Sequence, residues 1–281
     1  MPTTFSNVEA ERRSGERIRF SFGTNWRKFV PLITSERVEQ AATSLRESYA
    51  GAPVRGQRFI DVGCGSGLFS LCALRVGASE VVSMDVDPNS VECVRALRGG
   101  EGRPSNWTIH EGSILDRAFL ASVQPAARVY SWGVLHHTGS VWQAVENAMS
   151  LVAPGGLLCL GLYNRPNHAR LHLGLKRFYN RLPRPLRPLL SLAYGSALLG
   201  AIAIVRGQNP VRYVVEYGRQ SRGMSFWRDV EDWLGGLPCE FVDEHDVREF
   251  AKSRQFVVER VLRRGPGANN EYLLHRLGSC S

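Results

Sequence analysis

Short apolar runs and longer helical patterns alternate through the first 165 residues of the chain. The apolar runs predict five strands, at 59–62, 80–85, 107–110, 128–132 and 157–162. Apolar residues three and four positions apart predict the helices between them, at 68–76, 87–98 and 141–152. Strands and helices that alternate in this way predict a parallel sheet covered by helices on both faces.

The pattern changes on either side of this region. Residues 35–50 predict a helix ahead of the first strand, with Ser35 as its candidate cap. Near the end of the chain, two helical patterns lead into two strand patterns, and we expect the last strand to run antiparallel. These four elements are predicted at 222–236, 243–252, 255–263 and 271–277.

The first predicted strand runs into a helix through a turn with three glycines, Gly63, Gly65 and Gly67. Glycine adopts unusual backbone angles and lets a ligand approach the chain closely. The free N–H groups at the start of the helix favour a negatively charged group. The turn therefore predicts a nucleotide-type cofactor site.

Two acidic residues narrow the choice of cofactor. Asp61 stands just before the turn, and Asp85 lies 22 residues after Gly63, at the tip of the second strand. Asp85 can accept hydrogen bonds from both ribose hydroxyls there; the alternative is a helix cap, which Asp87 fits better. The patterns GxGxxG and GxxxxGK[ST] are both absent, which argues against a pyrophosphate. Asp61 suits the ammonium group of an amino-acid ligand.

An aromatic-rich segment, 19–29, precedes the first core strand and contains Phe22 and Trp26. One interpretation is a helix or loop that packs its aromatic side chains on the domain. The other is a lid over the cofactor and substrate, with Phe22 and Trp26 as pocket walls. The two interpretations are compatible.

Residues 165–223 interrupt the rhythm of strands and helices. Between residues 165 and 187 the segment is basic without a single acid, and an apolar stretch of 17 residues follows, Leu189–Val205. A helix of that length is roughly 25 Å long, short of a membrane span. Three interpretations stay open: a helical cap over the active site, a peripheral membrane contact and a true span.

Composition bounds the partners and the compartment. The net charge of +9 and the pI of about 9.6 permit nucleic acid, anionic lipid or an acidic small molecule as partner. The six cysteines show neither CxxC pairing nor metal-ligand spacing, so we expect free thiols in a reducing cytoplasm and no metal site. The start of the chain lacks a signal-peptide pattern, and we expect residues 1–19 to be loosely ordered.

Several stretches resemble the motifs of one enzyme family. Residues Ile60–Gly67 look like motif I of the class I S-adenosylmethionine-dependent methyltransferases, and Trp132–His137 with Leu151–Gly156 look like their later motifs. The chain is most similar to the small-molecule branch typified by the quinone-biosynthesis enzymes. The resemblance covers residues 55–165 specifically. It implies an α/β fold: a Rossmann-like, doubly wound, mostly parallel seven-stranded sheet with an antiparallel last strand and a helical insertion after strand five.

The resemblance also implies S-adenosylmethionine as cofactor and assigns residues to it. The implied cofactor-binding residues are Asp61, Gly63, Cys64, Gly65, Gly67, Asp85, Val86, Ser113, Ile114 and Trp132. Within this set the glycine turn holds the methionine part, Asp61 orients the ammonium group and Asp85 binds the ribose. Many relatives carry an aspartate for the adenine amine where this chain has Ser113, so that contact is left to Ser113, Ile114 or the backbone.

The chemistry implied is an in-line transfer of a methyl group from sulfur, in which the protein aligns the acceptor and excludes water. A hydroxyl acceptor must also lose a proton, and a histidine suits that step. His136 and His137 follow strand four, where a base reaches the acceptor, and we favour His137. The alternative is that one of them packs under the cofactor or makes a structural hydrogen bond. Tyr163 and Asn164, at the tip of strand five, are candidate substrate contacts.

The leading prediction is a small-molecule methyltransferase that acts on oxygen, with an aromatic or lipophilic substrate. No Asn-Pro-Pro-aromatic motif follows strand four, and Cys239 lies too far downstream to be the attacking cysteine of a base methylase. An RNA methyltransferase that uses the basic insertion is the second hypothesis, and a non-catalytic cofactor-binding scaffold is the third. We divide the chain into a lid region (1–50), a cofactor-binding core (51–164), the insertion (165–223) and a C-terminal part of the core (224–281).

Overall fold

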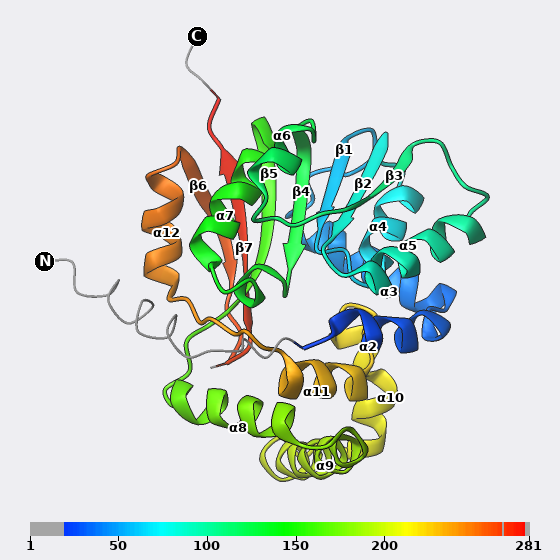
Figure 1. Ribbon diagram of the computed structural model, residues 1–281, viewed down its shortest axis with the longest axis vertical. Coiled ribbons are helices and arrows are strands. Elements are labelled where there is room, and N and C mark those ends of the chain that lie inside the picture. The colour runs from blue at the N-terminus through cyan, green and yellow to red at the C-terminus, as the bar shows by residue number, and fades with distance from the viewer. Residues whose placement is uncertain (1–19, 266, 279–281) are drawn as a thin grey trace, which may run out of the picture.

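Seven strands form one sheet in the computed structural model, which describes residues 20–265 and 267–278. The strand order is β3-β2-β1-β4-β5-β7-β6 (Figure 1). Strands β1 to β5 pair in parallel, and β7 runs antiparallel between β5 and β6. The strands are β1 (Arg58–Val62), β2 (Glu80–Asp85), β3 (Trp107–Glu111), β4 (Ala126–Trp132), β5 (Val152–Tyr163), β6 (Phe256–Leu262) and β7 (Asn269–Arg276). The predicted doubly wound sheet with its antiparallel last strand is confirmed.

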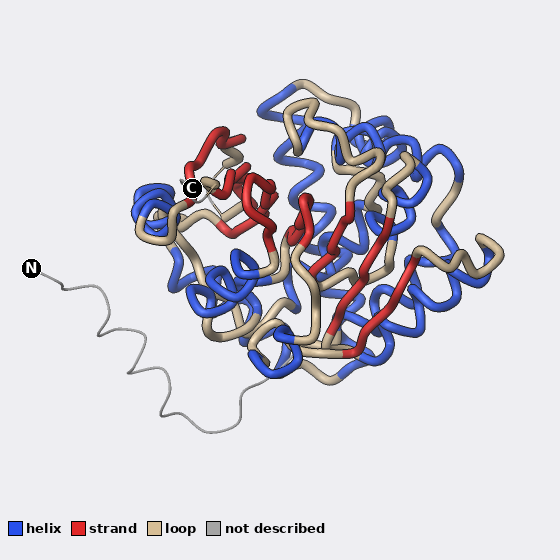
Figure 2. The backbone as a smooth tube through the Cα atoms, turned by 90° about the horizontal axis from the view of Figure 1, so that it is seen from above, coloured by secondary structure: helices blue, strands red, loops and turns tan. Residues whose placement is uncertain are grey.

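Helices cover both faces of the sheet, as the view in Figure 2 shows. The alternation of side chains along β1 explains why: Phe59 belongs to one buried cluster and Ile60 to the other. The helices packed in the cluster of Phe59 are α3 (Ser35–Ser48), α4 (Leu68–Arg75) and α5 (Pro88–Gly100). Those in the cluster of Ile60 are α6 (Arg117–Ala121), α7 (Val141–Ser150) and α12 (Glu244–Lys252).

Local chemistry explains where the elements depart from the predicted bounds. Thr34, not Ser35, caps α3, because its hydroxyl accepts a hydrogen bond from the backbone N–H of Arg37. Strand β5 already begins at Val152 and takes in residues 154–156, which we expected to be a turn. The register between β4 and β5 is irregular there, which accommodates the proline and glycines. The predicted loose segment 1–19 lies outside the described residues.

Four helices, which we call the cap, lie beyond the carboxyl edge of the sheet (Figure 1). They are α8 (Ala169–Arg181), α9 (Arg187–Arg206), α10 (Pro210–Gln220) and α11 (Phe226–Gly235). Phe226, Val230 and Leu234 form an apolar stripe along α11, and this stripe packs in a separate buried cluster with Tyr179 of α8. We had grouped residues 224–281 with the core, but α11 belongs to the cap because its stripe faces α8 and α9.

The apolar stretch 189–205 forms most of α9. Within the described part of the chain, 184–206 is the one helical stretch long and apolar enough to cross a membrane. Its inner face nevertheless packs within the cap: Gly195 lies so close to Trp227 that a Cβ there would be 2.5 Å from the indole ring. The structure therefore places α9 as the outer helix of the cap.

Candidate cofactor and acceptor site

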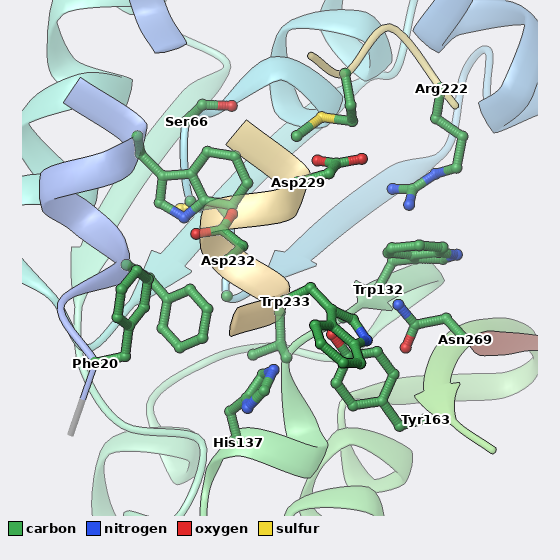
Figure 3. A pocket seen from close by; sticks show the side chains of 18 of the residues that line it. Phe20, Ser66, Trp132, His137, Tyr163, Arg222, Asp229, Asp232, Trp233 and Asn269 are labelled. Carbon is green, nitrogen blue, oxygen red and sulfur yellow. The ribbon is translucent and has the colours of Figure 1, made fainter. Parts of the chain in front are cut away.

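One cavity of about 1100 Å³ lies between the carboxyl edge of the sheet, the cap and helix α2 (Phe22–Phe29). Its walls combine the glycine turn and the tips of β2, β4 and β5 with side chains from α2 and the cap (Figure 3). Cavities at the carboxyl edge of an open parallel sheet are the usual ligand sites of this architecture.

The glycine turn brings its backbone close to the neighbouring segments. Gly63 and Gly65 both have positive φ, of 70° and 54°. A Cβ at Gly63 would lie 2.3 Å from Val134, and one at Gly65 would lie 2.8 Å from the indole of Trp26. Larger residues are thus excluded on steric grounds at both positions, which line the cavity together with Cys64.

Gly67, which we predicted to bind the cofactor, lies against helix α5. It is absent from the cavity wall, and its φ of 83° marks the residue that precedes α4. A Cβ at Gly67 would lie 3.0 Å from Val94 of α5. Gly67 therefore lets the turn before α4 approach α5 closely, and unlike Gly63 and Gly65 it does not line the cavity.

Asp85 ties the glycine turn to the tip of β2. One carboxylate oxygen accepts a hydrogen bond from the N–H of Gly65 and the other from the N–H of Asp87, both at 2.9 Å. Burial raises the pKa of Asp85 above its ordinary value, although these hydrogen bonds favour the carboxylate. Each oxygen keeps a lone pair, so the carboxylate can still accept from ligand hydroxyls.

Three further predicted residues line the cavity near Asp85: Val86, Ser113 and Ile114. Val86 follows β2, and the other two follow β3, the neighbouring parallel strand. The hydroxyl of Ser113 accepts a hydrogen bond from the N–H of Leu115 at 3.1 Å. Ser113 thereby shapes its own turn, and Val86 and Ile114 present apolar side chains to the space between the two strand tips.

Asp61 ends a chain of buried hydrogen bonds. Trp107 donates to Ser83 at 2.8 Å, Ser83 to Ser70 at 2.7 Å, and Ser70 to the carboxylate of Asp61 at 2.6 Å. Burial raises the pKa of Asp61 to about 7, while the bond from Ser70 opposes that rise. The chain holds the carboxylate of Asp61 at the cavity wall.

Trp132, at the end of β4, lines the cavity as predicted and meets a cation that sequence reasoning missed. The guanidinium of Arg222 lies 3.4 Å from the centroid of the Trp132 ring and donates to the hydroxyl of Tyr130 at 2.8 Å. The buried Nε atom of Arg222 has no hydrogen-bond partner among the described residues. Arg222 therefore brings a positive charge with an unused donor to the cavity wall, and this charge lowers the pKa of Asp61 against the larger effect of burial.

The two histidines have different surroundings. His136 is fully buried and is not part of the cavity wall; its Nδ1 accepts a hydrogen bond from the N–H of Tyr163 at 3.3 Å. His137 lines the cavity, and its Nδ1 lies 2.7 Å from the carbonyl oxygen of Pro238. A carbonyl only accepts, so Nδ1 carries the proton and Nε2 is left as the acceptor nitrogen. His136 supports Tyr163, and only His137 faces the space where an acceptor fits.

Aromatic rings surround His137. Phe22 from α2 and Tyr163 from β5 lie 4.8 and 5.6 Å from its ring, between centroids. Trp233 of the cap continues the same wall (Figure 3), and Tyr194 stacks on it with ring centroids 5.0 Å apart. This end of the cavity therefore suits a flat, apolar group.

Asn164, a predicted substrate contact, lies elsewhere. Its backbone pairs with Val242 and Ala268, and its side chain is not part of the cavity wall. The amide at this end of the cavity comes from Asn269, at the start of β7. Because β7 is antiparallel, it brings its first residue to the edge where β5 ends, and the sequence pattern of β5 alone gave no sign of that neighbour.

Two carboxylates of α11 also face the cavity, Asp229 and Asp232. Asp229 accepts a hydrogen bond from the hydroxyl of Tyr217, and Asp232 accepts one from the side chain of Asn25, each at 2.8 Å. Burial raises the pKa of Asp229 to about 6 and that of Asp232 well above its ordinary range. Sequence reasoning missed both, although an acid three residues after Phe226 lies on the apolar face of the helix and signals a cavity there.

Helix α2 forms the lid over this site. Phe22 and Trp26 line the cavity, and the backbone N–H of Gly23 donates to the carboxylate of Asp87 at 2.9 Å. On its other side Asn25 reaches across to α11. The aromatic segment thus both packs on the domain and closes the cavity, so the two interpretations hold together.

Comparison with known proteins identifies the domain. Residues 59–156 match the model of a family described as a methyltransferase domain. The chain has a class I methyltransferase domain. This confirms the resemblance drawn from the sequence, together with the family's cofactor, S-adenosylmethionine.

Curated relatives share this domain over part of their length. A ribosomal protein L11 methyltransferase of Azotobacter vinelandii is 36% identical over 112 residues, which are 39% of this chain and 35% of that protein. A ubiquinone biosynthesis O-methyltransferase of Methylocella silvestris is 31% identical over 120 residues, 43% of this chain and 45% of that protein. The chain thus spans between a third and a half of the length of these relatives.

The fold is similar to that of a solved structure, the magnesium protoporphyrin IX methyltransferase of Synechocystis PCC 6803. The TM-score is 0.52 at 14% identity, and the match covers 98% of this chain and 95% of that one. At this identity the likeness concerns the fold.

The residues around the methyltransferase cavity fit S-adenosylmethionine. Its amino-acid end needs an acid for the ammonium group and a donor for the carboxylate, and Asp61 and Arg222 both line the cavity. Its ribose needs an acceptor, and Asp85 stands at the tip of β2. A volume of about 1100 Å³ exceeds that of a site for one drug-sized ligand, so a cofactor and an acceptor fit together.

Proposed function

We propose that this protein transfers a methyl group from S-adenosylmethionine to an oxygen atom of a small aromatic or lipophilic molecule. One observation carries the proposal: a single cavity has the acids and glycines of the cofactor end at one side and aromatic rings around His137 at the other. The lid and the cap close over both ends, which favours a small acceptor over a polymer.

Five residues would hold the cofactor: Gly63 and Gly65 by close backbone approach, Asp61 at the ammonium group, Asp85 at the ribose and Arg222 at the carboxylate. When bound, S-adenosylmethionine supplies a methyl group made reactive by the positive charge on sulfur. The chain's own task is to align the acceptor with that group and to exclude water. The lid residue Trp26, packed on Gly65, serves the second purpose.

The acceptor would lie against Phe22, Tyr163 and Trp233, with its hydroxyl at Nε2 of His137. The bond from Nδ1 to the carbonyl of Pro238 fixes the tautomer in which Nε2 can take the hydroxyl proton. Burial lowers the pKa of His137 to about 3, and the nearby ammonium of Lys176 acts in the same direction. The histidine is thus neutral at physiological pH, and its Nε2 can accept a hydrogen bond from the hydroxyl of the acceptor.

We also propose that the protein is cytoplasmic. The described cysteines are all free thiols, at positions 64, 72, 93, 159 and 239. Free thiols are in keeping with a reducing compartment.

The test is transfer of labelled methyl from S-adenosylmethionine into a cell extract, with mass spectrometry of the labelled product. We expect label in a small, organic-soluble molecule, and much less of it with Asp85→Ala protein at the same concentration of S-adenosylmethionine. Label recovered in RNA or protein would reject the small-molecule acceptor. A labelled product whose new methyl group sits on nitrogen or carbon would reject the assignment to oxygen.

A further inference from the structure

The outer surface of the cap gathers most of the exposed apolar side chains. Residues 165–223 are about a fifth of the chain. Of the fourteen large apolar side chains that are exposed among the described residues, ten belong to this segment. They are Leu171, Phe178, Leu186, Leu189, Leu192, Leu198, Ile204, Val205, Val211 and Val215. Apolar side chains clustered in this way mark an interaction surface.

The same segment carries the positive charge of the protein. Residues 165–223 contain eleven arginines and lysines and one acid, Glu216. The whole chain has a net charge of +9, so the remaining residues are close to neutral. The exposed arginines of the segment are Arg165, Arg170, Arg177, Arg181, Arg184, Arg206, Arg212 and Arg219. The segment therefore combines exposed apolar side chains with exposed arginines, of which Arg165, Arg212 and Arg219 also pair with acids.

Helix α9 lies at the centre of this surface. No charged residue occurs between Arg187 and Arg206, and α9 is the element farthest from the sheet in Figure 1. Its inner face packs through Ser191, Gly195 and Ile202, whereas its outer face is equally apolar and is covered by none of the described residues. A helix that is apolar on all sides needs an apolar environment on its outer side too.

The C-terminal end of α9 and the start of α10 extend this outer face. Ile204 and Val205 are 86% and 81% exposed, and Val211 and Val215, one turn apart on α10, are 73% and 79% exposed. Branched aliphatic side chains this exposed are costly in water. They form a strip that spans two helices of the cap.

We propose that the outer surface of the cap, α9 with the first turns of α10 and the surrounding arginines, docks on an anionic lipid bilayer. The apolar strip would sit at the boundary between headgroups and acyl chains, and the arginines would pair with lipid phosphates. Charge complementarity selects this occupant: the eight exposed arginines that accompany the apolar strip match an anionic membrane, whereas a purely apolar protein partner would offer them no anions. The proposal goes beyond methyl transfer and does not depend on it.

The docking surface also meets the cavity. Leu198 and Arg206 of α9 are exposed and at the same time line the cavity, as does Tyr213 of α10. The wall between the bilayer and the cavity is then one helix thick. A lipophilic acceptor dissolved in the membrane would reach the aromatic end of the cavity past these residues without crossing water.

The test is flotation of the full chain with two kinds of vesicle, phosphatidylcholine alone and phosphatidylcholine with phosphatidylglycerol. We expect binding to the anionic vesicles that weakens with added salt. Two independent variants probe the surface, Ile204→Asp/Val205→Asp for the apolar strip and Arg181→Glu/Arg184→Glu for the cations. Each should lose at least about tenfold in vesicle affinity. The matched controls are Val257→Asp, an exposed valine of β6, and Arg46→Glu/Lys252→Glu, exposed cations of α3 and α12.

Titration with S-adenosylmethionine and thermal melting establish that each variant is folded, so a failure to float is separate from a failure of the proposed function. No flotation of the native protein overturns the proposal, and so does equal flotation of the native protein and both cap variants. A lipid-free dimer that Ile204→Asp/Val205→Asp converts to a monomer would assign the surface to a second copy of the chain instead.

Discussion

The backbone N–H of Gly23 donates a hydrogen bond of 2.9 Å to the carboxylate of Asp87, 64 positions further along the chain. The other carboxylate oxygen of Asp87 accepts from the N–H of Asn89 and caps α5. One side chain thus starts a core helix and holds the lid. A Cβ on Gly23 would lie 2.5 Å from the carboxyl group of Asp87, so the lid approaches this closely only with glycine.

The Gly23→Ala variant tests the hydrogen bond between the lid and Asp87 separately from the helix cap that Asp87 provides. The added methyl group breaks the bond to the lid and leaves the cap of α5 intact. We expect cofactor affinity to fall roughly tenfold, the range for a lost hydrogen bond to a charged group, with little change in melting temperature. Titration calorimetry and thermal melting measure the two effects.

The matched control is Thr34→Ala, which removes the side-chain cap of α3, a helix that does not line the cavity. It should cost about 1 kcal/mol of stability and leave cofactor affinity as it was. Native cofactor affinity in Gly23→Ala protein would mean that the bond to Asp87 has no part in closing the site.

Asp85→Ala should weaken cofactor binding by about ten- to a hundredfold, because it removes the ribose acceptor and frees the N–H groups of Gly65 and Asp87. Asp85→Asn retains one acceptor oxygen and should have an intermediate affinity. Titration calorimetry with S-adenosylmethionine measures the affinity of both variants. Unaltered affinity in the alanine variant would count against the ribose assignment.

The ionisation of Asp61 should make cofactor binding depend on pH. Burial raises its pKa from the ordinary value of 3.8 to about 7, and only the carboxylate attracts an ammonium group. We therefore expect affinity to rise roughly five- to tenfold between about pH 6 and about pH 7.5, and this rise to be absent in Asp61→Asn protein.

The stability of the cofactor-free protein should change in the opposite direction. Between about pH 4 and about pH 7 the folded protein keeps a proton on Asp61 that the unfolded chain has released, so this residue lowers the free energy of unfolding as pH rises. Denaturant titrations of native and Asp61→Asn protein across this range measure that contribution. Parallel curves for the two proteins would contradict the raised pKa.

His137→Ala should lower turnover by about a hundredfold or more and leave cofactor affinity unchanged, since general bases contribute on that scale. Because burial lowers the pKa of His137 to about 3, its protonation should cause no loss of activity above about pH 4. Steady-state rates across pH test both points. His136→Ala, in contrast, should lower stability, because it removes the acceptor for the N–H of Tyr163. Native turnover in His137→Ala protein would remove the base from the mechanism.

The cofactor half of the site was predictable because it is local in sequence. The glycine turn, Asp61 and Asp85 all lie within one strand–helix–strand unit, where the spacing of residues determines their position at the sheet edge. The sequence does not show that Gly67 lies off the cavity wall, because a glycine beside a cavity and a glycine packed on a helix look alike in a sequence. Its contact with Val94 distinguishes them only in three dimensions.

The rest of the site depends on contacts between distant segments. Arg222 reaches Trp132 across 90 positions, and Asn25 reaches Asp232 across 207. Hydrophobic periodicity predicts that the helices exist, but it does not say which of them meet. Only the acid on the apolar face of α11 carried a local signal, and a helix in an ordinary core would have an apolar residue there.

The contacts of Asn25 determine which segments must be exchanged to transfer acceptor specificity between related enzymes. Its side chain donates both to the carboxylate of Asp232 and to the backbone carbonyl of Arg228, so the lid and α11 form one joint wall. The recognised domain, 59–156, contains neither partner. A chimaera that receives the cap of another enzyme without its helix α2 would lose the matched contact between these two parts of the cavity wall. To transfer acceptor specificity, helix α2 and the cap should therefore be exchanged together, since one precedes and the other follows the domain in the sequence.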